Sequence, residues 1–159
     1  MLTEIDRQVA QEFQRRVADI TPILDLRVFG SRARNDFTEA LRESQILLEA
    51  SAFMGTINRA YYAMFYVLLA VLVVNCLSAV KHSGAIALFD REFVKTGISP
   101  KSLSRSLHIA FDRCQRHDYG KMVWATHEVA QDTLSAARIF VHALESYLEN
   151  MGFVASEEE

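Results

Sequence analysis

The residues best suited to chemistry lie near the end of one predicted helix. Arg113 and His117 are four positions apart, so they share one face if the helix continues through both. Arg116 directly precedes His117, and Asp118 and Tyr119 follow it. Guanidinium groups bind phosphate, and a histidine with its ordinary pKa of about 6.5 can exchange a proton at neutral pH. The group could therefore bind an anion, or its charges could form ion pairs and cap the helix end.

Three further polar residues are candidates for the same site. Asn58 and Arg59 open a very apolar helix, where polar groups commonly serve as caps or as hydrogen bonds between helices. The alternative is that Arg59 joins Arg113 or Arg116 in a pocket for the phosphate of a nucleotide or RNA. His82 lies in a predicted loop, and it could tie this loop to the rest of the fold or line that pocket.

The elements that carry these residues are predicted to be helices. The 159 residues include only 6 Gly and 2 Pro, and so few breakers favour long helices over many short strands. Helices are expected at about 37–52, 57–77, 84–95, 100–116 and 127–150. The residues expected to cap helix N-termini are Asp36 with Glu39, Thr56, Ser83, Ser99 and Thr126. Gly97 and Gly152 are expected to end the helices that precede them. Short loops make consecutive helices antiparallel, so the predicted fold is all-α, an up-and-down bundle of about five helices with an N-terminal helical extension.

The N-terminal segment shows a different pattern. Residues 4–19 have helical periodicity, and one face carries the apolar side chains Ile5, Val9, Phe13, Val17 and Ile20. A short strand over 23–29 and a turn at Gly30-Ser31 are expected next, and the polar segment 32–36 is the expected domain boundary. The predicted division is an extension over 1–36, a helical domain over 37–152 and an acidic tail over 153–159.

Charge and cysteine content exclude several classes of protein. The net charge is −3 and the isoelectric point about 6.0, whereas a dedicated duplex-DNA binder is usually basic. Cys76 and Cys114 lack the spacing of metal ligands, so we expect buried thiols in a reducing cytosol, with no metal and no cofactor. Residues 60–80 carry no charge, but Asn75 and Ser78 interrupt the apolar run. A core helix of a soluble, cytoplasmic protein is therefore expected rather than a membrane span.

Several motifs occur in the order seen in one known family. They are Asn58-Arg59-Ala60-Tyr61-Tyr62-Ala63-Met64-Phe65-Tyr66, Lys81-His82-Ser83-Gly84, Phe89 with Phe93-Val94-Lys95, Asp118-Tyr119 and Ala136-Ala137-Arg138-Ile139-Phe140-Val141. Over about residues 37–150 the sequence thus resembles HEPN domains. The resemblance implies a helical domain of the nucleotide-binding type.

A second resemblance precedes the first. The motif Phe29-Gly30-Ser31-Arg32-Ala33-Arg34, which follows an amphipathic helix and a short apolar segment, looks like the opening of a minimal nucleotidyltransferase domain. In that fold the Gly-Ser turn binds phosphate, and paired aspartates hold the divalent metal. Asp36 stands alone here, so the resemblance implies a truncated remnant or fusion junction that transfers no nucleotide. The alternative is a docking helix followed by a chance Gly-Ser turn.

The HEPN resemblance also indicates what the site could do. Many HEPN domains resemble metal-independent ribonucleases, in which an arginine stabilises phosphate charge and a histidine moves protons, with four to six residues between the two. Only three residues separate Arg113 from His117, and Asp118-Tyr119 follows as in the subgroup without the ribonuclease spacing. The leading prediction is a binding or regulatory module, a homodimer paired with a minimal nucleotidyltransferase in a toxin–antitoxin-like or nucleotide-related system. The alternatives are an endoribonuclease toxin that uses Arg113 and His117, and a purely structural partner subunit.

Overall fold

The computed structural model describes residues 26–116 and 124–152, with side chains from residue 34 onward. Over these residues the chain forms five α-helices, one π-helical turn and no strand. In chain order they are α2 (Leu26–Glu49), α3 (Phe53–Val74), α4 (His82–Phe89), the π-helix η1 (Asp90–Val94), α5 (Lys101–Gln115) and α6 (His127–Asn150). The predicted all-α fold is confirmed.

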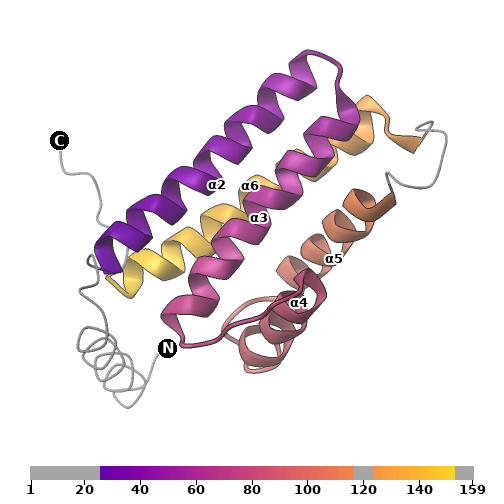
Figure 1. Ribbon diagram of the computed structural model, residues 1–159. Helices are drawn as coiled ribbons and strands as arrows, with labels where there is room; N and C mark the ends of the chain where they lie inside the picture. Colours follow the sequence, from indigo (N-terminus) through magenta and orange to yellow (C-terminus); the bar gives the residue numbers. More distant parts are fainter. Residues whose placement is uncertain (1–25, 117–123, 153–159) are drawn as a thin grey trace.

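The long helices run alternately up and down, as the short connections predict (Figure 1). α3 lies between α2 and α5, with α6 behind it in this view, and it packs against all three. α4 and η1 form a shorter helical connection beside α5. The start of α3, the end of α5 and the start of α6 meet at one end of the bundle. This end carries Arg113 and Arg116.

The centre of the core is α3, because this helix is apolar on nearly all sides. Tyr61, Met64, Val67, Leu68 and Val71 are fully buried. By length and composition the helix could cross a membrane, but 61% of its most apolar 18-residue window is buried inside the bundle. Its packing against α2, α5 and α6 is therefore that of a core helix.

The break between α2 and α3 lies three residues earlier than the sequence predicts. We expected it at Gly55-Thr56 with Thr56 as a cap, whereas both residues lie inside α3. The turn is made by Ala50–Ala52, and Ser51 adopts the left-handed conformation with φ 57°. Gly55 serves helix packing instead, because a Cβ atom there would lie 3.1 Å from Cδ1 of Leu47 on α2. The hydroxyl of Thr56 donates to the carbonyl of Ala52 within α3.

The start of α2 corrects the expected N-terminal pattern. Residues 26–29 are helical where a strand was predicted, and Gly30-Ser31 and the segment 32–36 continue the helix without a turn. The capping box at Asp36 and Glu39 is therefore also wrong, since both lie within α2. A short apolar run does not distinguish helix from strand, and one interior glycine costs a helix only about 1 kcal/mol. The helix predicted over 4–19 lies outside the described residues.

The remaining helix ends agree with the sequence in part. The side chain of Thr126 caps α6 by accepting a hydrogen bond from Val129 N at 3.2 Å, as predicted. Gly97 and Gly152 have positive φ angles of 81° and 77° just after helical segments, also as predicted. The caps at Ser83 and Ser99 are wrong: α4 is capped at Lys81, and Pro100 takes the N-cap position of α5 in an extended conformation. These two helices begin within one or two residues of the predicted starts.

Candidate functional site

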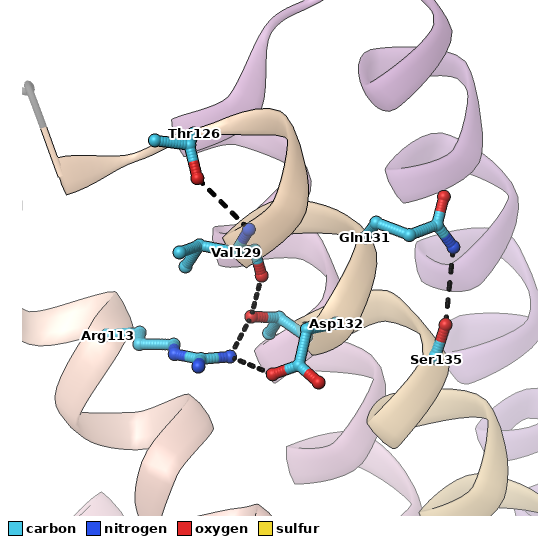
Figure 2. Close-up of polar contacts among 7 residues, drawn as sticks. Arg113, Thr126, Val129, Gln131, Asp132 and Ser135 are labelled. Atoms are coloured by element: carbon cyan, nitrogen blue, oxygen red, sulfur yellow. Dashed lines mark hydrogen bonds and ion pairs between the residues drawn. The ribbon is translucent and has the colours of Figure 1, made fainter.

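Arg113 lies on the last turn of α5 and is held by the first turns of α6. Its Nη1 atom donates to Asp132 Oδ2 at 2.7 Å and to Thr133 Oγ1 at 2.8 Å. The hydroxyl of Thr133 in turn donates to the carbonyl oxygen of Val129 at 2.7 Å. Figure 2 shows this chain of contacts, which continues from Val129 N to the capping hydroxyl of Thr126. The conformation of Arg113 is therefore determined by the way α6 begins.

These contacts occupy only one nitrogen of the guanidinium group. Among the described residues, Asp132 and Thr133 are the hydrogen-bond partners of Arg113, and both bind Nη1. The edge formed by Nε and Nη2, which is the edge that binds phosphate or carboxylate in a bidentate manner, has no partner within residues 34–116 and 124–152. The Arg113 side chain is 23% exposed, so an anion could reach it.

Arg116 and Trp124 border the same end of the bundle. Arg116 is the exposed C-cap residue of α5, and its guanidinium carbon lies 5.9 Å from the centre of the Trp124 ring. Trp124 also packs against a small core cluster formed by Leu48, Ile57, Ala130 and Leu134. The indole thus contributes to packing at this end of the bundle.

His117, Asp118 and Tyr119 lie outside the described residues. They follow Arg116 directly in the chain, so they belong to the connection between α5 and α6. Their geometry relative to Arg113 stays a prediction from the sequence.

Arg59 is directed toward α2 rather than toward Arg113. Its Nε atom lies 2.5 Å from Glu43 Oε2, and its guanidinium carbon is 5.8 Å from the centre of the Tyr62 ring. The carboxylate oxygen lies off the direction of the Nε–H bond, so the contact is an ion pair rather than a directed hydrogen bond. No contact among the described residues joins Arg59 to Arg113 or Arg116. Asn58 is half-buried in the first turns of α3, and the pocket predicted for these residues stays a prediction.

His82 lies at the start of α4, where its ring is surrounded by aromatic side chains. Its Nδ1 atom is 2.8 Å from the hydroxyl of Tyr61, and its ring stacks on Phe65 with centroids 4.0 Å apart. Burial, with smaller contributions from Cys114 and Tyr62, raises the pKa of Tyr61, so its hydroxyl is protonated at neutral pH. The hydrogen bond ties α4 to α3, which is one of the two roles that the sequence allowed for His82.

A second polar cluster joins η1 to α5. Asp90 accepts a hydrogen bond from the hydroxyl of Ser104 at 2.5 Å, and its other carboxylate oxygen is 2.7 Å from Nε2 of His108. Neither Asp90 nor His108 was among the candidates from the sequence, so this contact was missed. The described residues contain no group of three or more histidine, cysteine, aspartate or glutamate side chains that could hold a metal ion.

Sequence reasoning also missed Glu43, Asp132 and Thr133 as partners of the arginines. Arg113 contacts residues 19 and 20 positions away on a different helix, so no local spacing reveals the pairing. One signal was available, because Thr133 is a polar residue on the apolar stripe that contains Ala130 and Ala137. A polar side chain on a buried stripe needs a hydrogen-bond partner.

Comparison with known proteins identifies the family. The family model of the HEPN domain matches residues 32–147, which include most of α2 and α6 and all the helices between them. The chain belongs to the HEPN family. A UPF0332 protein of Thermotoga maritima is 37% identical over 113 residues, covering 71% of this chain and 86% of that protein.

Two further relatives come from Methanocaldococcus jannaschii, and both are named as candidate toxins. One is 26% identical over 141 residues, covering 84% of this chain and 96% of the relative. The other is 28% identical over 113 residues, covering 71% of this chain and 84% of the relative. The HEPN match starts inside α2, so the first 31 residues of the chain precede the HEPN domain.

Proposed function

We propose that this HEPN protein is a toxin-like binding or regulatory module whose site accepts the phosphate of a nucleotide or RNA. The observation that carries the proposal is the way Asp132 and Thr133 hold one nitrogen of Arg113 and leave its Nε–Nη2 edge without a described partner. An arginine held in this way loses little conformational entropy when it binds a phosphate. The names of the two Methanocaldococcus relatives support the toxin-like role.

The charged residues near Arg113 are compatible with binding of a single phosphate group. Arg116 adds a second exposed guanidinium one turn further along, while Asp132 offsets one positive charge. The Asp132 side chain is 67% exposed, so water screens its repulsion of a phosphate. His117, Asp118 and Tyr119 follow Arg116 and complete the proposed site. Arg59 and His82 contact Glu43 and Tyr61 instead, so the proposal rests on the end of α5 and the residues that follow it.

The proposed system contains a second protein. In this proposal the chain forms a homodimer in the cytoplasm and pairs with a minimal nucleotidyltransferase, as part of a toxin–antitoxin-like or nucleotide-related system. The names of the two Methanocaldococcus relatives are compatible with such a system. Co-purification of the chain with a co-expressed minimal nucleotidyltransferase from a neighbouring gene would test the pairing, and two proteins that elute independently would contradict it.

The second candidate function is a metal-independent endoribonuclease. The same fixed conformation of Arg113 favours it, because a catalytic arginine must be preorganised toward the charge that develops on the phosphate. His117 would then move the proton, although only three residues separate the two side chains in the sequence. A purely structural subunit is the third candidate, and it requires no ligand at Arg113.

One set of variants distinguishes the three candidates. Binding of a fluorescent single-stranded RNA and of ATP would be measured for the wild type, Arg113→Ala and Arg105→Ala, together with growth arrest on expression. Arg105 is an exposed arginine on the outer face of α5, so its variant controls for the loss of one positive charge. We expect Arg113→Ala to lose binding and Arg105→Ala to retain it. Equal binding by all three proteins would contradict the proposed site, and no binding by the wild type would leave the structural subunit.

His117→Ala separates binding from catalysis. If RNA binding and growth arrest persist in this variant, the binding or regulatory module stands. If His117→Ala abolishes both RNA cleavage and growth arrest while the protein remains folded, the endoribonuclease is the function and the leading proposal is wrong.

A further inference from the structure

One side of α3 is not covered by the described helices. Tyr62, Tyr66, Leu69 and Val73 follow one another at helical spacing, and we call them the aromatic stripe. Each is only partly buried, and Val73 is 37% exposed. All other apolar residues from Ile57 to Val74, apart from Phe65, are buried. The central helix of the bundle thus leaves a row of apolar side chains in contact with solvent between Tyr62 and Val73.

The geometry of α3 places the aromatic stripe opposite the bundle. Helical periodicity puts it on the other side of α3 from the fully buried residues Ala60, Met64, Val67 and Val71. In Figure 1, α6 lies behind α3, while α2 and α5 lie on its two sides. The edges of the stripe are marked by the Arg59–Glu43 ion pair toward α2 and by His82, whose ring is 5.9 Å from that of Tyr62. One further helix would fit alongside α2 and complete the enclosure of α3.

The chain itself contains a segment of matching character. The 25 residues before α2 have apolar side chains at helical spacing, with polar residues between them. The apolar members are Ile5, Val9, Phe13, Val17 and Ile20. At 1.5 Å per residue, a helix from Ile5 to Ile20 is about 22 Å long, and the stripe from Tyr62 to Val73 is about 16 Å long. The apolar row of the segment is therefore long enough to cover the whole stripe.

The attachment point of this segment also fits. α2 begins at Leu26 and runs antiparallel to α3, so its first residue lies at the end of the bundle where α3 finishes at Val74. A chain that turns back at residues 21–25 would run antiparallel to α2 and alongside the stripe, as successive helices do in an up-and-down bundle. A tether this short gives the segment an effective concentration of about 1 mM or more at the stripe.

We infer that residues 4–20 form an amphipathic helix that packs its apolar face on the aromatic stripe of the same chain. This contact adds a helix to the HEPN bundle that the HEPN match, starting at residue 32, does not contain. It is independent of the function proposed for Arg113. A partner protein that needs this side of α3 must first displace the N-terminal helix.

Tyrosine nitration of the full-length protein tests this contact. Tetranitromethane modifies exposed phenols, and peptide mass spectrometry reads Tyr62 and Tyr66 separately from the fully buried Tyr61. We expect slow nitration of Tyr62 and Tyr66 in the wild type and a several-fold faster reaction in Phe13→Asp. The matched control is Gln11→Asp, which places the same charge on the opposite face of the predicted helix and should react like the wild type.

The other outcomes contradict the inference. Equal nitration of Tyr62 and Tyr66 in the three proteins means that the segment does not cover the stripe. Protection in the wild type that disappears on dilution means that a second copy covers it instead. If Tyr61 also becomes reactive in Phe13→Asp, the variant has unfolded, and Val9→Asp is then judged by the same criteria with Tyr61 as its folding control.

Discussion

Two basic residues of this protein, His82 and Arg113, are both fixed by hydrogen bonds, but in different surroundings. His82 is enclosed by aromatic rings, stacks on Phe65 and bonds to the hydroxyl of the fully buried Tyr61. Arg113 lies at the end of the bundle and is bound through one nitrogen to Asp132 and Thr133. The interactions of His82 are directed inward and hold two helices together. Those of Arg113 orient a charged group that solvent and ligands can reach.

The difference shows that the same kind of contact, a hydrogen bond that holds a side chain in place, can serve either folding stability or ligand binding. A buried polar group that loses its partner costs free energy of folding, because water cannot replace that partner. An ion pair as exposed as Arg113–Asp132 contributes little to stability, since water screens it. Substitutions in the aromatic cluster around His82 should therefore reduce stability, and those around Arg113 should reduce binding. Four predictions test this contrast, from the largest expected effect to the smallest.

Tyr61→Ala should have the largest effect on stability. The Tyr61 ring is fully buried and contacts His82 and Phe111, so its removal leaves a cavity and an unpaired Nδ1 on His82. Large-to-small substitutions of aromatic core residues typically cost about 3–5 kcal/mol. Urea unfolding followed by circular dichroism measures the free energy of unfolding. Ile109→Ala is the control at an apolar side chain that is 42% exposed, and an equal loss in both variants would contradict the assignment of Tyr61 to the core.

Arg113→Ala should reduce binding far more than stability. Hydrogen bonds to a charged group contribute about 1.5–3 kcal/mol, so RNA affinity should fall by roughly tenfold to a hundredfold. The free energy of unfolding should change by about 1 kcal/mol or less, because the ion pair with Asp132 is exposed. Fluorescence anisotropy and urea unfolding measure the two quantities on the same sample. A variant that loses stability and keeps its affinity would reverse the contrast between Arg113 and His82.

Tyr61→Phe should isolate the hydrogen bond to His82 and its pH dependence. Losing the hydroxyl should cost about 1 kcal/mol at pH 8. Burial raises the pKa of Tyr61 above the ordinary value of about 10 that the unfolded chain has, so this stabilisation is fully present below pH 10 and is lost as the pH rises above it. The difference in unfolding free energy between the wild type and Tyr61→Phe should therefore shrink from pH 8 to pH 11. A difference that grows over this range would show that Tyr61 ionises more readily when folded.

Thr133→Val should have the smallest effect. The substitution keeps the volume of a buried side chain but removes the hydroxyl that accepts from Arg113 and donates to Val129. The arginine would retain Asp132 and become less well oriented, so RNA affinity should fall a few-fold, and by less than in Arg113→Ala. Thr126→Ala, which removes the cap of α6 without a direct contact to Arg113, is the matched control for stability. An affinity equal to that of the wild type would show that Asp132 alone positions Arg113.

The limits of sequence reasoning are visible in particular residues. Thr126 was predicted as the cap of α6 because a cap depends on residues within one turn. The strand predicted over 23–29 was wrong for residues 26–29, because a short apolar run takes its secondary structure from what it packs against. Thr56 was misplaced for a related reason, since the first turn of α3 packs closely on Leu47 of α2 and continues through Gly55.

By itself, the sequence determined the all-α fold, the central apolar helix, the approximate spans of the helices from α3 to α6 and the likeness to HEPN domains. These properties follow from composition, periodicity and short motifs, which are local along the chain. Only the tertiary structure decided that Arg59 pairs with Glu43, that Arg113 is held by Asp132 and Thr133, and that His82 bonds to Tyr61. These pairs join different helices, and the contacts of a side chain between helices depend on how the helices pack rather than on their spacing in the chain.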